Sequence, residues 1–300
     1  MNGFVFIDAG GTQIKSAAYS GSGERLCSIH SVPSLSAENK DTVLGNFLSV
    51  IEKEKQVLRA SGYSLNAVGF SFPGPFDYPE GICLIRGLHK YESIYGIPLR
   101  EAFLHFPGQQ AVTPETRLFF LHDMASFALG EAYRSLSGQS PRILCLCIGT
   151  GAGSAFLEEG RLLTKDPRIP DQGWIYPFPL RGASIDDWIS ARGLEKLAVS
   201  AGFPSGTSGK DLSCLAADGN SAAREVWHEF GTLIAEALSP FVLSFSPQQI
   251  LFGGQISKAM EYFRKEVQEA FPELLLSAVP DTTESMFRGL YEAMTTDEHV

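Results

Sequence analysis

The chain has 300 residues, of which 44% are hydrophobic and 19% are charged, ordinary values for a globular protein long enough to form two lobes with separate cores. Its net charge of −10 argues against nucleic acid and anionic membrane surfaces as partners, because an acidic surface repels both. The five cysteines form no regular framework, and no apolar run is long enough to span a bilayer, so we expect a reducing, cytoplasmic setting.

The first part of the chain predicts hairpin strands followed by a helix and a further strand. A short apolar run ends at Asp8, a Gly-Gly turn follows, and a second apolar run continues to Tyr19. Alternating Ser and Gly at 20–23 is a hairpin signal, and the residues after it predict a returning strand. The predicted elements are strands over 3–7, 13–19, 25–30 and 67–72 and a helix over 41–60.

The rest of the chain repeats this beginning and then becomes mainly helical. A buried apolar run over 143–148 is closed by a glycine-rich turn, and the content of Gly, Ser and Pro over 202–211 indicates a surface loop. Hairpins mixed with alternating strands and helices place the chain in the α/β class. The predicted elements are strands over 118–121, 143–148, 154–157, 161–164 and 249–252 and helices over 125–134, 227–245, 260–271 and 285–294.

The segment Asp8-Ala9-Gly10-Gly11-Thr12 is the first candidate for chemistry. Its two glycines allow the backbone to approach a phosphate and to point N–H groups at it, and its threonine adds a hydroxyl donor. Its aspartate, at the end of a strand, can hold a hydrated Mg²⁺ ion, and Lys15 can add positive charge nearby. The alternative is an ordinary tight hairpin with Lys15 in solvent.

Two further glycine turns follow buried strands. Gly149-Thr150-Gly151-Ala152-Gly153 repeats the order of strand, turn and strand, and two such half-structures would place two glycine turns around one nucleotide. At Gly253-Gly254 a flat ligand such as adenine can lie on the backbone, and Ser257 can cap the next helix. Each turn taken alone is also explained as a simple hairpin or strand end.

The dipeptide His122-Asp123 directly follows a predicted strand and opens a helix. A carboxylate in this position lies where substrates usually meet α/β sheets, so Asp123 is a candidate to accept the proton of a hydroxyl group that attacks a γ-phosphate. The alternative is that Asp123 only caps a helix beginning at Met124.

The motifs follow one another in a fixed order from Phe4 to the helix around Gly289. They are Asp-x-Gly-Gly-Thr, Pro-Gly-Pro, Asp-x-x-x-x-x-x-Gly-Glu, Gly-Thr-Gly-x-Gly and Gly-Gly-x-x-Ser. This order resembles the sugar kinases of the repressor/ORF/kinase (ROK) family. The resemblance implies the superfold of actin, hexokinase and the heat-shock chaperones, a two-lobed actin-like ATPase (ribonuclease H-like) fold with the nucleotide cleft between the lobes. We expect one lobe over 1–115 plus 285–300 and the other over 116–284.

The same resemblance implies roles for single residues. The segments Asp8 to Thr12 and Thr150 to Gly153 would cradle the phosphates of ATP, which binds with Mg²⁺ near Asp8, and Gly253-Gly254 would border adenosine. Asp123 would be the general base toward a sugar hydroxyl, and Gly74 and His122 would lie near the sugar.

The sequence departs from the family's pattern in the part that binds sugar. His122 replaces the Asn that usually precedes the catalytic Asp, the Asn expected near His89 is not evident, and the Glu-x-Gly-His segment appears as Asp171-Gln172-Gly173-Trp174. Asp171 can replace the Glu, whereas Trp174 cannot replace a histidine that binds both sugar and metal. The cysteine-rich zinc segment is replaced by 176–188, which contains no cysteine, so we expect no structural zinc.

Two points in this region remain open. Trp174 and Tyr176 either stack on a sugar face or fill the space left by the zinc segment, and filling is favoured because aromatic residues more often pack than bind. The histidines outside the motifs, including His30 and His105, show no metal spacing and are expected to be solvated or packed.

We therefore expect ATP-dependent phosphorylation of a hydroxyl group on a sugar or sugar derivative, with Asp123 as the base and a small sugar as the partner. One alternative is a non-catalytic, sugar-responsive regulator, and another is an ATPase of the same superfold with a non-sugar substrate. A homodimer is the expectation for the family. The altered sugar pocket leaves the sugar itself unspecified.

Overall fold

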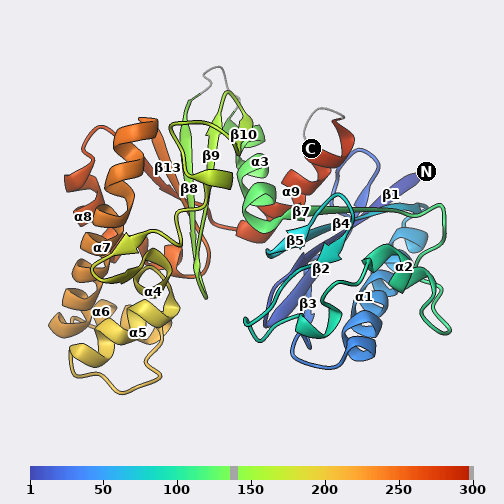
Figure 1. Cartoon of the computed structure of the whole chain (residues 1–300), viewed down its shortest axis with the longest axis horizontal. Helices are drawn as coiled ribbons and strands as arrows, with labels where there is room; N and C mark the ends of the chain where they lie inside the picture. The colour runs from blue at the N-terminus through green and yellow to red at the C-terminus, as the bar shows by residue number, and fades with distance from the viewer. Residues whose placement is uncertain (136–140, 297–300) are drawn as a thin grey trace. The chain divides into compact units, whose positions relative to one another are not determined.

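The computed structural model describes residues 1–135 and 141–296, and the chain folds into two compact units (Figure 1). The first unit comprises Met1–Glu131 and a second segment that begins at Thr283, and the second unit comprises Ala132–Thr282. The predicted boundary after residue 115 differs from this division. Strand β7 (Arg117–His122) pairs with the sheet of the first unit, so the strand and the adjoining Asp123 belong to that unit.

The first unit is built around a five-stranded sheet with the order β3-β2-β1-β4-β7. Strands β1, β4 and β7 are parallel to one another, whereas β2 is antiparallel to both β1 and β3. The strands and helices of this unit are β1 Asn2–Ala9, β2 Gln13–Ser20, β3 His30–Pro33, α1 Lys40–Ala60, β4 Ser64–Phe72, β5 Phe76–Asp77, β6 Ile82–Cys83, η1 Glu92–Ile94, α2 Leu99–Leu104, β7 Arg117–His122, α3 Asp123–Ser135 and α9 Thr282–Thr295.

The strand predicted over 25–30 is wrong in position. Arg25 makes only an isolated bridge to Tyr19, and the regular strand β3 begins at His30. In the segment between Arg25 and His30, the Cys27 sulfur contacts the Ala18 N–H group at 3.5 Å. In a continuous pair of strands a carbonyl oxygen would accept from that N–H group. The hairpin signal therefore predicted the turn correctly. After the bridge at Arg25, the chain leaves the sheet and pairs with β2 again only at β3.

Strand β1 is buried on both faces because its side chains alternate between two layers. Val5 and Ile7 pack in the core that includes α1, whereas Phe6 contacts Phe287 of α9, with 6.3 Å between ring centroids. An apolar residue at nearly every position of this strand is what such a strand requires. The phosphate-loop candidate thus begins at the end of a strand that is buried on both faces, which gives it a rigid base.

Helices α3 and α9 approach each other through two glycines. A Cβ atom at Gly289 would clash with the carbonyl oxygen of Ser126, and a Cβ atom at Gly130 would clash with that of Ser285. Beside this contact Ser285 donates a hydrogen bond to the buried carboxylate of Glu131. Only glycine at these two positions allows the helix backbones to lie so close, which fixes the start of α3 where Asp123 stands.

The second unit repeats the topology of the first, with the sheet order β10-β9-β8-β13-β14. Strand β9 is antiparallel to β8 and β10, whereas β8, β13 and β14 are parallel, so the repeated order of strand, turn and strand is confirmed. The elements of this unit are β8 Ile143–Ile148, β9 Ala152–Glu158, β10 Arg161–Leu163, η2 Asp171–Gly173, β11 Pro179–Leu180, β12 Ala183–Ser184, α4 Ile185–Trp188, α5 Ala191–Ser200, α6 Gly209–Ala217, α7 Ser221–Phe245, β13 Gln249–Gly253, η3 Ile256–Ala259, α8 Met260–Ala270 and β14 Leu275–Ala278.

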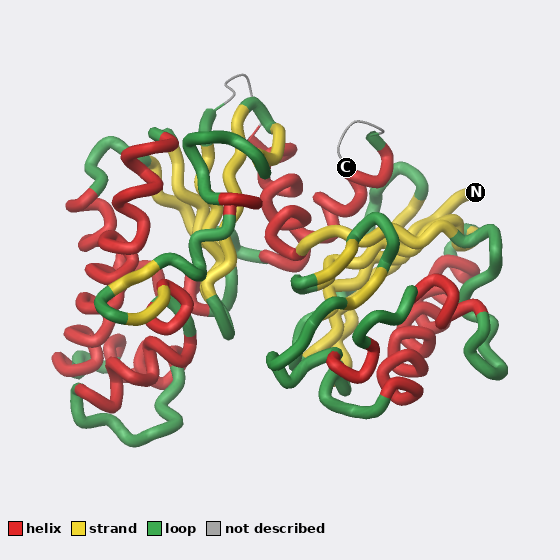
Figure 2. Tube along the Cα trace, in the orientation of Figure 1, coloured by secondary structure: helices red, strands yellow, loops and turns green. Residues whose placement is uncertain are grey.

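The loop predicted over 202–211 is shorter than expected. Helix α6 begins at Gly209, because Ser208 and Asp211 form a capping box in which each side chain binds the other residue's backbone N–H group. Figure 2 shows this helix among the other helices of the second unit, and it packs against α5 and α7. The Ser-Gly content that indicated a loop includes the cap that starts the helix.

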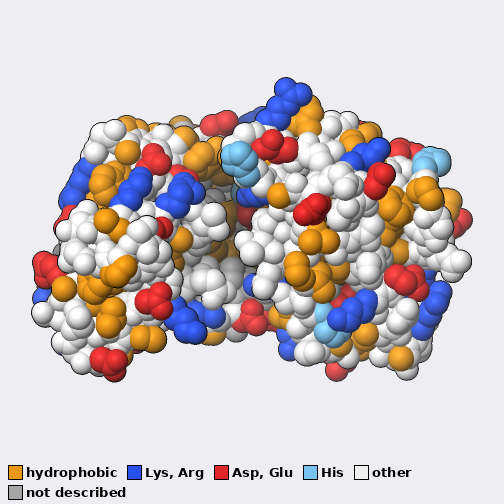
Figure 3. Space-filling model, turned by 90° about the horizontal axis from the view of Figure 1, so that it is seen from below, with side chains coloured by type: hydrophobic (Ala, Val, Ile, Leu, Met, Phe, Trp, Pro, Cys, Tyr) orange, Lys and Arg blue, Asp and Glu red, His pale blue; other side chains and the backbone are white. Residues whose placement is uncertain are grey.

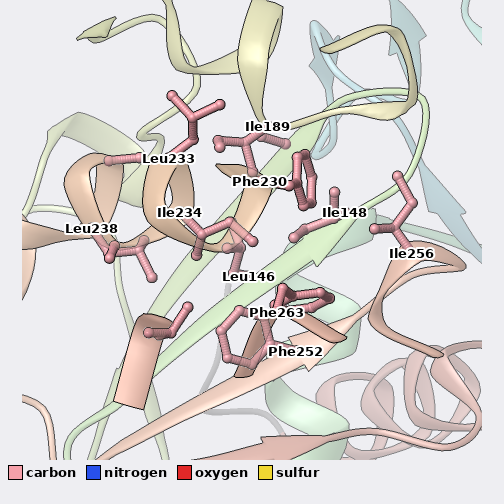
Figure 4. Close-up of a cluster of buried hydrophobic side chains, with 14 of the residues drawn as sticks. Leu146, Ile148, Ile189, Phe230, Leu233, Ile234, Leu238, Phe252, Ile256 and Phe263 are labelled. Carbon is pink, nitrogen blue, oxygen red and sulfur yellow. The ribbon is translucent and has the colours of Figure 1, made fainter. Parts of the chain in front are cut away.

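The core of the second unit lies between the sheet and helices α7 and α8 (Figure 4). Leu146 and Ile148 of β8 meet Phe230 and Ile234 of α7, and Phe252 of β13 packs against Phe263 of α8 with 5.9 Å between ring centroids. Each such fully buried side chain contributes roughly 1.5–3 kcal/mol to stability. This packing holds the ends of β8 and β13, from which the two glycine turns of the unit emerge.

Acidic and basic side chains are interspersed on the face of each unit seen in Figure 3, and hydrophobic side chains lie singly or in small groups among them. Among the described residues, every helix is too short or too polar to cross a membrane.

Candidate active site

In the first unit, the parallel strands end at one edge of the sheet and bring the predicted residues together. Asp8 pairs in register with Ser71, and Phe72 pairs with His122. A Cβ atom at Gly74 would lie 3.5 Å from the His122 ring, which is ordinary van der Waals contact. Because the carboxyl ends of parallel strands meet at the same edge, this is the position where α/β sheets bind ligands.

The carbonyl oxygens of the first glycine loop accept hydrogen bonds from residues outside the loop. The hydrogen bonds are Tyr91 hydroxyl to Gly10 O at 2.8 Å, Ser34 Oγ to Gly11 O at 2.6 Å, Ser36 Oγ to Gly11 O at 2.5 Å and Ser34 N to Thr12 O at 2.9 Å. In a trans peptide the N–H group points opposite to the carbonyl group, so the N–H groups of Gly11 and Thr12 point away from these anchors. Both residues are exposed, and their N–H groups can therefore donate to an anion.

Burial and two neighbouring charged residues determine the pKa of the Asp8 carboxyl group. Burial raises its pKa to about 6, the Lys15 ammonium group acts in the opposite direction, and the Asp123 carboxylate raises the pKa further. Lys15 remains beside Asp8 across the β1–β2 ladder, and its Nζ donates to the Thr283 hydroxyl at 2.8 Å. Asp8 and Asp123 are thus close enough to repel each other.

The residues around Asp8 fit a magnesium ion. Mg²⁺ prefers oxygen ligands and retains several waters, and Asp8 offers a half-buried carboxylate at the loop that faces an anion. On the neighbouring strand the hydroxyl group of Ser71 is buried and has no hydrogen-bond partner among the described residues. A hydrated cation would bring water to this hydroxyl and would offset the repulsion between Asp8 and Asp123.

The raised pKa of Asp8 predicts how stability depends on pH. The folded protein binds this proton more tightly than the unfolded chain, so the free energy of unfolding falls as pH rises from about 4 to about 6 and is then constant. Asp8→Asn removes this fall in the free energy of unfolding, because the amide does not ionise. In protein free of metal and nucleotide, we expect the variant to be more stable than wild type by on the order of 2 kcal/mol at pH 7.5. Urea unfolding at pH 4.5 and pH 7.5 measures the difference, which should be about three times smaller at the lower pH. An equal difference at both pH values would contradict this account.

Asp123 is the first residue of helix α3, and its two carboxylate oxygens make different contacts. Oδ1 accepts a hydrogen bond from Met124 N at 2.7 Å and lies 3.2 Å from His122 Nδ1, whereas Oδ2 makes neither contact. The side chain is 37% exposed, so the carboxylate is accessible to a substrate. The helix predicted over 125–134 begins two residues earlier, and Asp123 is its first residue rather than a cap before Met124.

Tyr78 is a neighbour of Asp123 that the sequence motifs did not indicate. Its ring packs edge-on to His122 with 5.9 Å between ring centroids, and its hydroxyl donates to Phe72 O at 3.1 Å. Burial raises the pKa of Tyr78, and the Asp123 carboxylate raises it further, so the hydroxyl stays neutral. A Cβ atom at Gly74 would lie 3.5 Å from this hydroxyl, so Gly74 keeps the space beside Tyr78 and His122 open.

The second glycine loop, in the second unit, is held by an ion pair. Asp186 Oδ1 accepts a hydrogen bond from Ala152 N at 2.8 Å, and Asp186 Oδ2 lies 2.7 Å from the Arg192 guanidinium group. Arg192 also donates to Thr150 O at 3.2 Å. A Cβ atom at Gly151 would lie 2.5 Å from Asp186 Oδ1, so a side chain at this position would displace the carboxylate. The sequence motifs indicated the glycines but not Asp186 or Arg192.

The third glycine turn is adjacent to the second loop within this unit. Gly253 is buried and paired with Cys147 in the sheet, whereas Gly254 is partly exposed with φ +85°. A Cβ atom at Gly254 would clash with Ile148 O, at the end of the strand that leads into the second loop. The prediction that Ser257 caps a helix is wrong, because it lies within η3 and its hydroxyl donates to Gly254 O at 2.7 Å.

The segment that departs from the family pattern lies at the surface of the second unit. Asp171 is exposed in the short helix η2, and the buried Ser154 hydroxyl holds the turn by donating to Gly173 O at 2.6 Å. Trp174 and Tyr176 are neighbours, with 6.2 Å between ring centroids. Tyr176 is 44% exposed, and the proposal that the two rings fill the space left by the zinc segment stays a prediction.

Comparisons with known proteins agree with this arrangement. The family model described as ROK family matches residues 4–290. The N-acetyl-D-glucosamine kinase of Vibrio parahaemolyticus is 25% identical over 90% of this chain and 90% of its own length. A crystal structure of a ROK family glucokinase from Streptomyces griseus, in complex with glucose and AMPPNP, superposes with a TM-score of 0.73 at 17% identity over 97% of this chain and 98% of that one. A ROK family transcriptional regulator, a homolog of the E. coli MLC protein, gives a TM-score of 0.78 at 19% identity over 98% of this chain and 78% of that chain.

Proposed function

Because the chain belongs to the ROK family, we propose that it is an ATP-dependent carbohydrate kinase that phosphorylates a hydroxyl group of a sugar or sugar derivative. Its fold is the two-lobed, actin-like ATPase fold. The observation that carries the proposal is Asp123, a carboxylate at the carboxyl edge of a parallel sheet with one oxygen accessible and Asp8 in electrostatic contact. A base beside a cation site is what phosphoryl transfer to an alcohol requires.

In the proposed reaction, Oδ2 of Asp123 accepts the proton of the substrate hydroxyl as that oxygen bonds to the γ-phosphorus and the bond to the β-phosphate oxygen breaks. The hydrogen bond from Met124 N to Oδ1 fixes the orientation of the carboxylate. Asp8 would hold Mg²⁺ through the ion's hydration shell, and the ion would supply positive charge to the phosphates. Asp123 holds the proton until it passes to solvent, and the sugar phosphate and ADP are the two products.

Each of the two glycine loops is proposed to contact phosphate oxygens. In the first loop the supporting observation is that the carbonyl groups are anchored, so Gly11 and Thr12 present their N–H groups to solvent. In the second loop Thr150 is exposed, and the Arg192 guanidinium group that holds its carbonyl offsets the charge of Asp186. Gly254 is partly exposed and has no side chain, and we propose that its backbone borders the adenosine.

On the sugar side, Gly74, His122 and Asp123 form one contiguous surface with Tyr78. His122 and Tyr78 offer ring faces and polar edges, which suit a ligand with both C–H faces and hydroxyl groups. Asp171 is proposed as a further sugar ligand in the place of the family's glutamate. Because these side chains differ from the family's usual set, we propose a specificity that differs from that of glucose kinases.

A second candidate function is a ligand-responsive regulator without turnover. It is favoured by the match to the ROK transcriptional regulator, which spans 98% of this chain and 78% of that protein. The presence of Asp123 with an accessible oxygen favours the kinase over this alternative.

Measurement of ADP release with and without a panel of hexoses, amino sugars and acylated sugars tests the proposal. Release that depends on one sugar supports the kinase, and mass spectrometry of the product identifies the phosphorylated sugar. Sugar binding without turnover, measured by calorimetry, would support the regulator instead. Turnover that is indifferent to every sugar would point to an ATPase with another substrate.

A further inference from the structure

Three side chains with metal-ligating atoms meet in the first unit, and none of them belongs to the candidate active site. Cys27 and His30 flank the start of β3, and Glu54 comes from the middle of α1. Their ligand atoms all lie within 4.8 Å of one another. Figure 1 shows α1 beside the strands β2 and β3, which is how residues 24 positions apart come together.

The carboxylate of Glu54 is the centre of this cluster, and it is fully buried, with 0% of its side chain exposed. Oε1 lies 2.7 Å from His30 Nδ1 and accepts a hydrogen bond from Ser16 Oγ at 2.7 Å, and Oε2 lies 3.5 Å from Cys27 Sγ. A buried carboxylate is costly unless positive charge and hydrogen bonds compensate for it. A cation bound at this carboxylate would add the positive charge that compensates for its burial.

The chemistry of the donors selects the ion. A thiol, an imidazole and a carboxylate together form a mixed S, N and O set that suits Zn²⁺, whereas Mg²⁺ and Ca²⁺ prefer oxygen ligands alone. Ligand atoms around a tetrahedral zinc ion lie about 3.4–3.6 Å apart, which the Sγ to Oε2 distance of 3.5 Å already matches. His30 has 27% of its side chain exposed, so an ion can reach the cluster from solvent.

We propose that Cys27, His30 and Glu54 form a zinc-binding site, with water as the fourth ligand, that ties the β2–β3 connection to helix α1. Binding releases the thiol proton of Cys27 to solvent and leaves a complex in which the two anionic ligands balance the charge of the ion. The site is structural in role, because β3 leads from His30 to Ser34, whose hydroxyl anchors the first glycine loop. The site is independent of the proposed kinase reaction.

From the sequence, His30 was expected to be solvated or packed, and no zinc was expected in the chain. Cys27 and His30 are separated by only two residues, a spacing found in metal sites, but their third partner comes from a helix later in the chain. No short motif contains all three residues, so the cluster becomes visible only in the fold.

Titration of the EDTA-treated full-length protein with Zn²⁺ in a calorimeter, in the presence of excess Mg²⁺, tests the proposal. We expect one equivalent to bind, and we expect a rise of about 5 °C in the melting temperature at a free zinc concentration of about 100 Kd. Cys27→Ser and His30→Gln should each weaken binding by at least about 100-fold. Co²⁺ should give a thiolate charge-transfer band in wild type that is absent from Cys27→Ser.

Two matched controls use exposed residues of the same types. Cys214→Ser and His105→Gln change side chains at the surface and should bind zinc as wild type does. The proposal fails if wild type binds no stoichiometric zinc, or if Cys27→Ser and His30→Gln bind it as tightly as the two controls do. In either case the cluster would be only a hydrogen-bond network around Glu54, and the kinase assay would be unaffected by the result.

Discussion

Replacement of Asp123 by asparagine is expected to lower kcat for sugar phosphorylation by about 10²–10⁴-fold, with little change in the KM for ATP. The amide cannot accept the proton of the attacking hydroxyl group, although it retains the oxygen that accepts the hydrogen bond from Met124 N. The start of α3 is therefore preserved, and the melting temperature should change little. Steady-state kinetics with the sugar identified by the panel, together with thermal unfolding, measure both quantities.

The matched control for this variant is Asp41→Asn, which removes a carboxylate from the first turn of α1 in the same unit, where the side chain is 78% exposed. It should leave kcat unchanged. If Asp123→Asn phosphorylates sugar at the wild-type rate, Asp123 is not the base and only begins a helix. If Asp123→Asn is inactive because it is unfolded, its far-UV circular dichroism would reveal this, and Asp123→Glu, which retains a carboxylate, would then separate the two roles.

The regular elements were predictable because their signals are local. Helix α1 was expected over 41–60 and runs Lys40–Ala60, since its apolar residues recur at helical spacing and Asn39 caps it by accepting from Thr42 N. Strands β1 and β8 were recognised as apolar runs that end at a glycine turn. The α/β class and the repeated arrangement of the two sheets followed from these elements, and the order of the glycine motifs led to the family.

Contacts between distant parts of the chain were not predictable, because no local pattern encodes them. Tyr91 anchors Gly10 across 81 positions, and Asp186 reaches Ala152 across 34 positions. The pairing of β7 with β4 likewise moved the boundary of the first unit beyond residue 115. In each case the residue types were ordinary, and their role depended on which strands and helices became neighbours.

The glycine at position 151 shows how such a distant contact can limit a local motif. A Cβ atom there would lie 2.5 Å from Asp186 Oδ1, so Gly151→Ala must displace the carboxylate that holds Ala152 N. Forcing extra atoms into a packed site typically costs 1–3 kcal/mol. We expect the affinity for a non-hydrolysable ATP analogue, measured by calorimetry, to fall about tenfold, which corresponds to about 1.4 kcal/mol. Gly45→Ala on helix α1, where the nearest atom lies 3.4 Å from the added Cβ, serves as the control and should bind the analogue normally.

A double-mutant cycle distinguishes a clash with Asp186 from a general loss of loop flexibility. Asp186→Ala alone should also weaken binding of the analogue, because Ala152 N and Arg192 lose their shared partner. With that carboxylate removed, the added methyl group at 151 has space, so Gly151→Ala should cost much less in the Asp186→Ala background than in wild type. An equal cost in both backgrounds would mean that the glycine is needed for its own backbone freedom or for direct contact with the phosphates. The position of Asp186 would then be incidental to the loop.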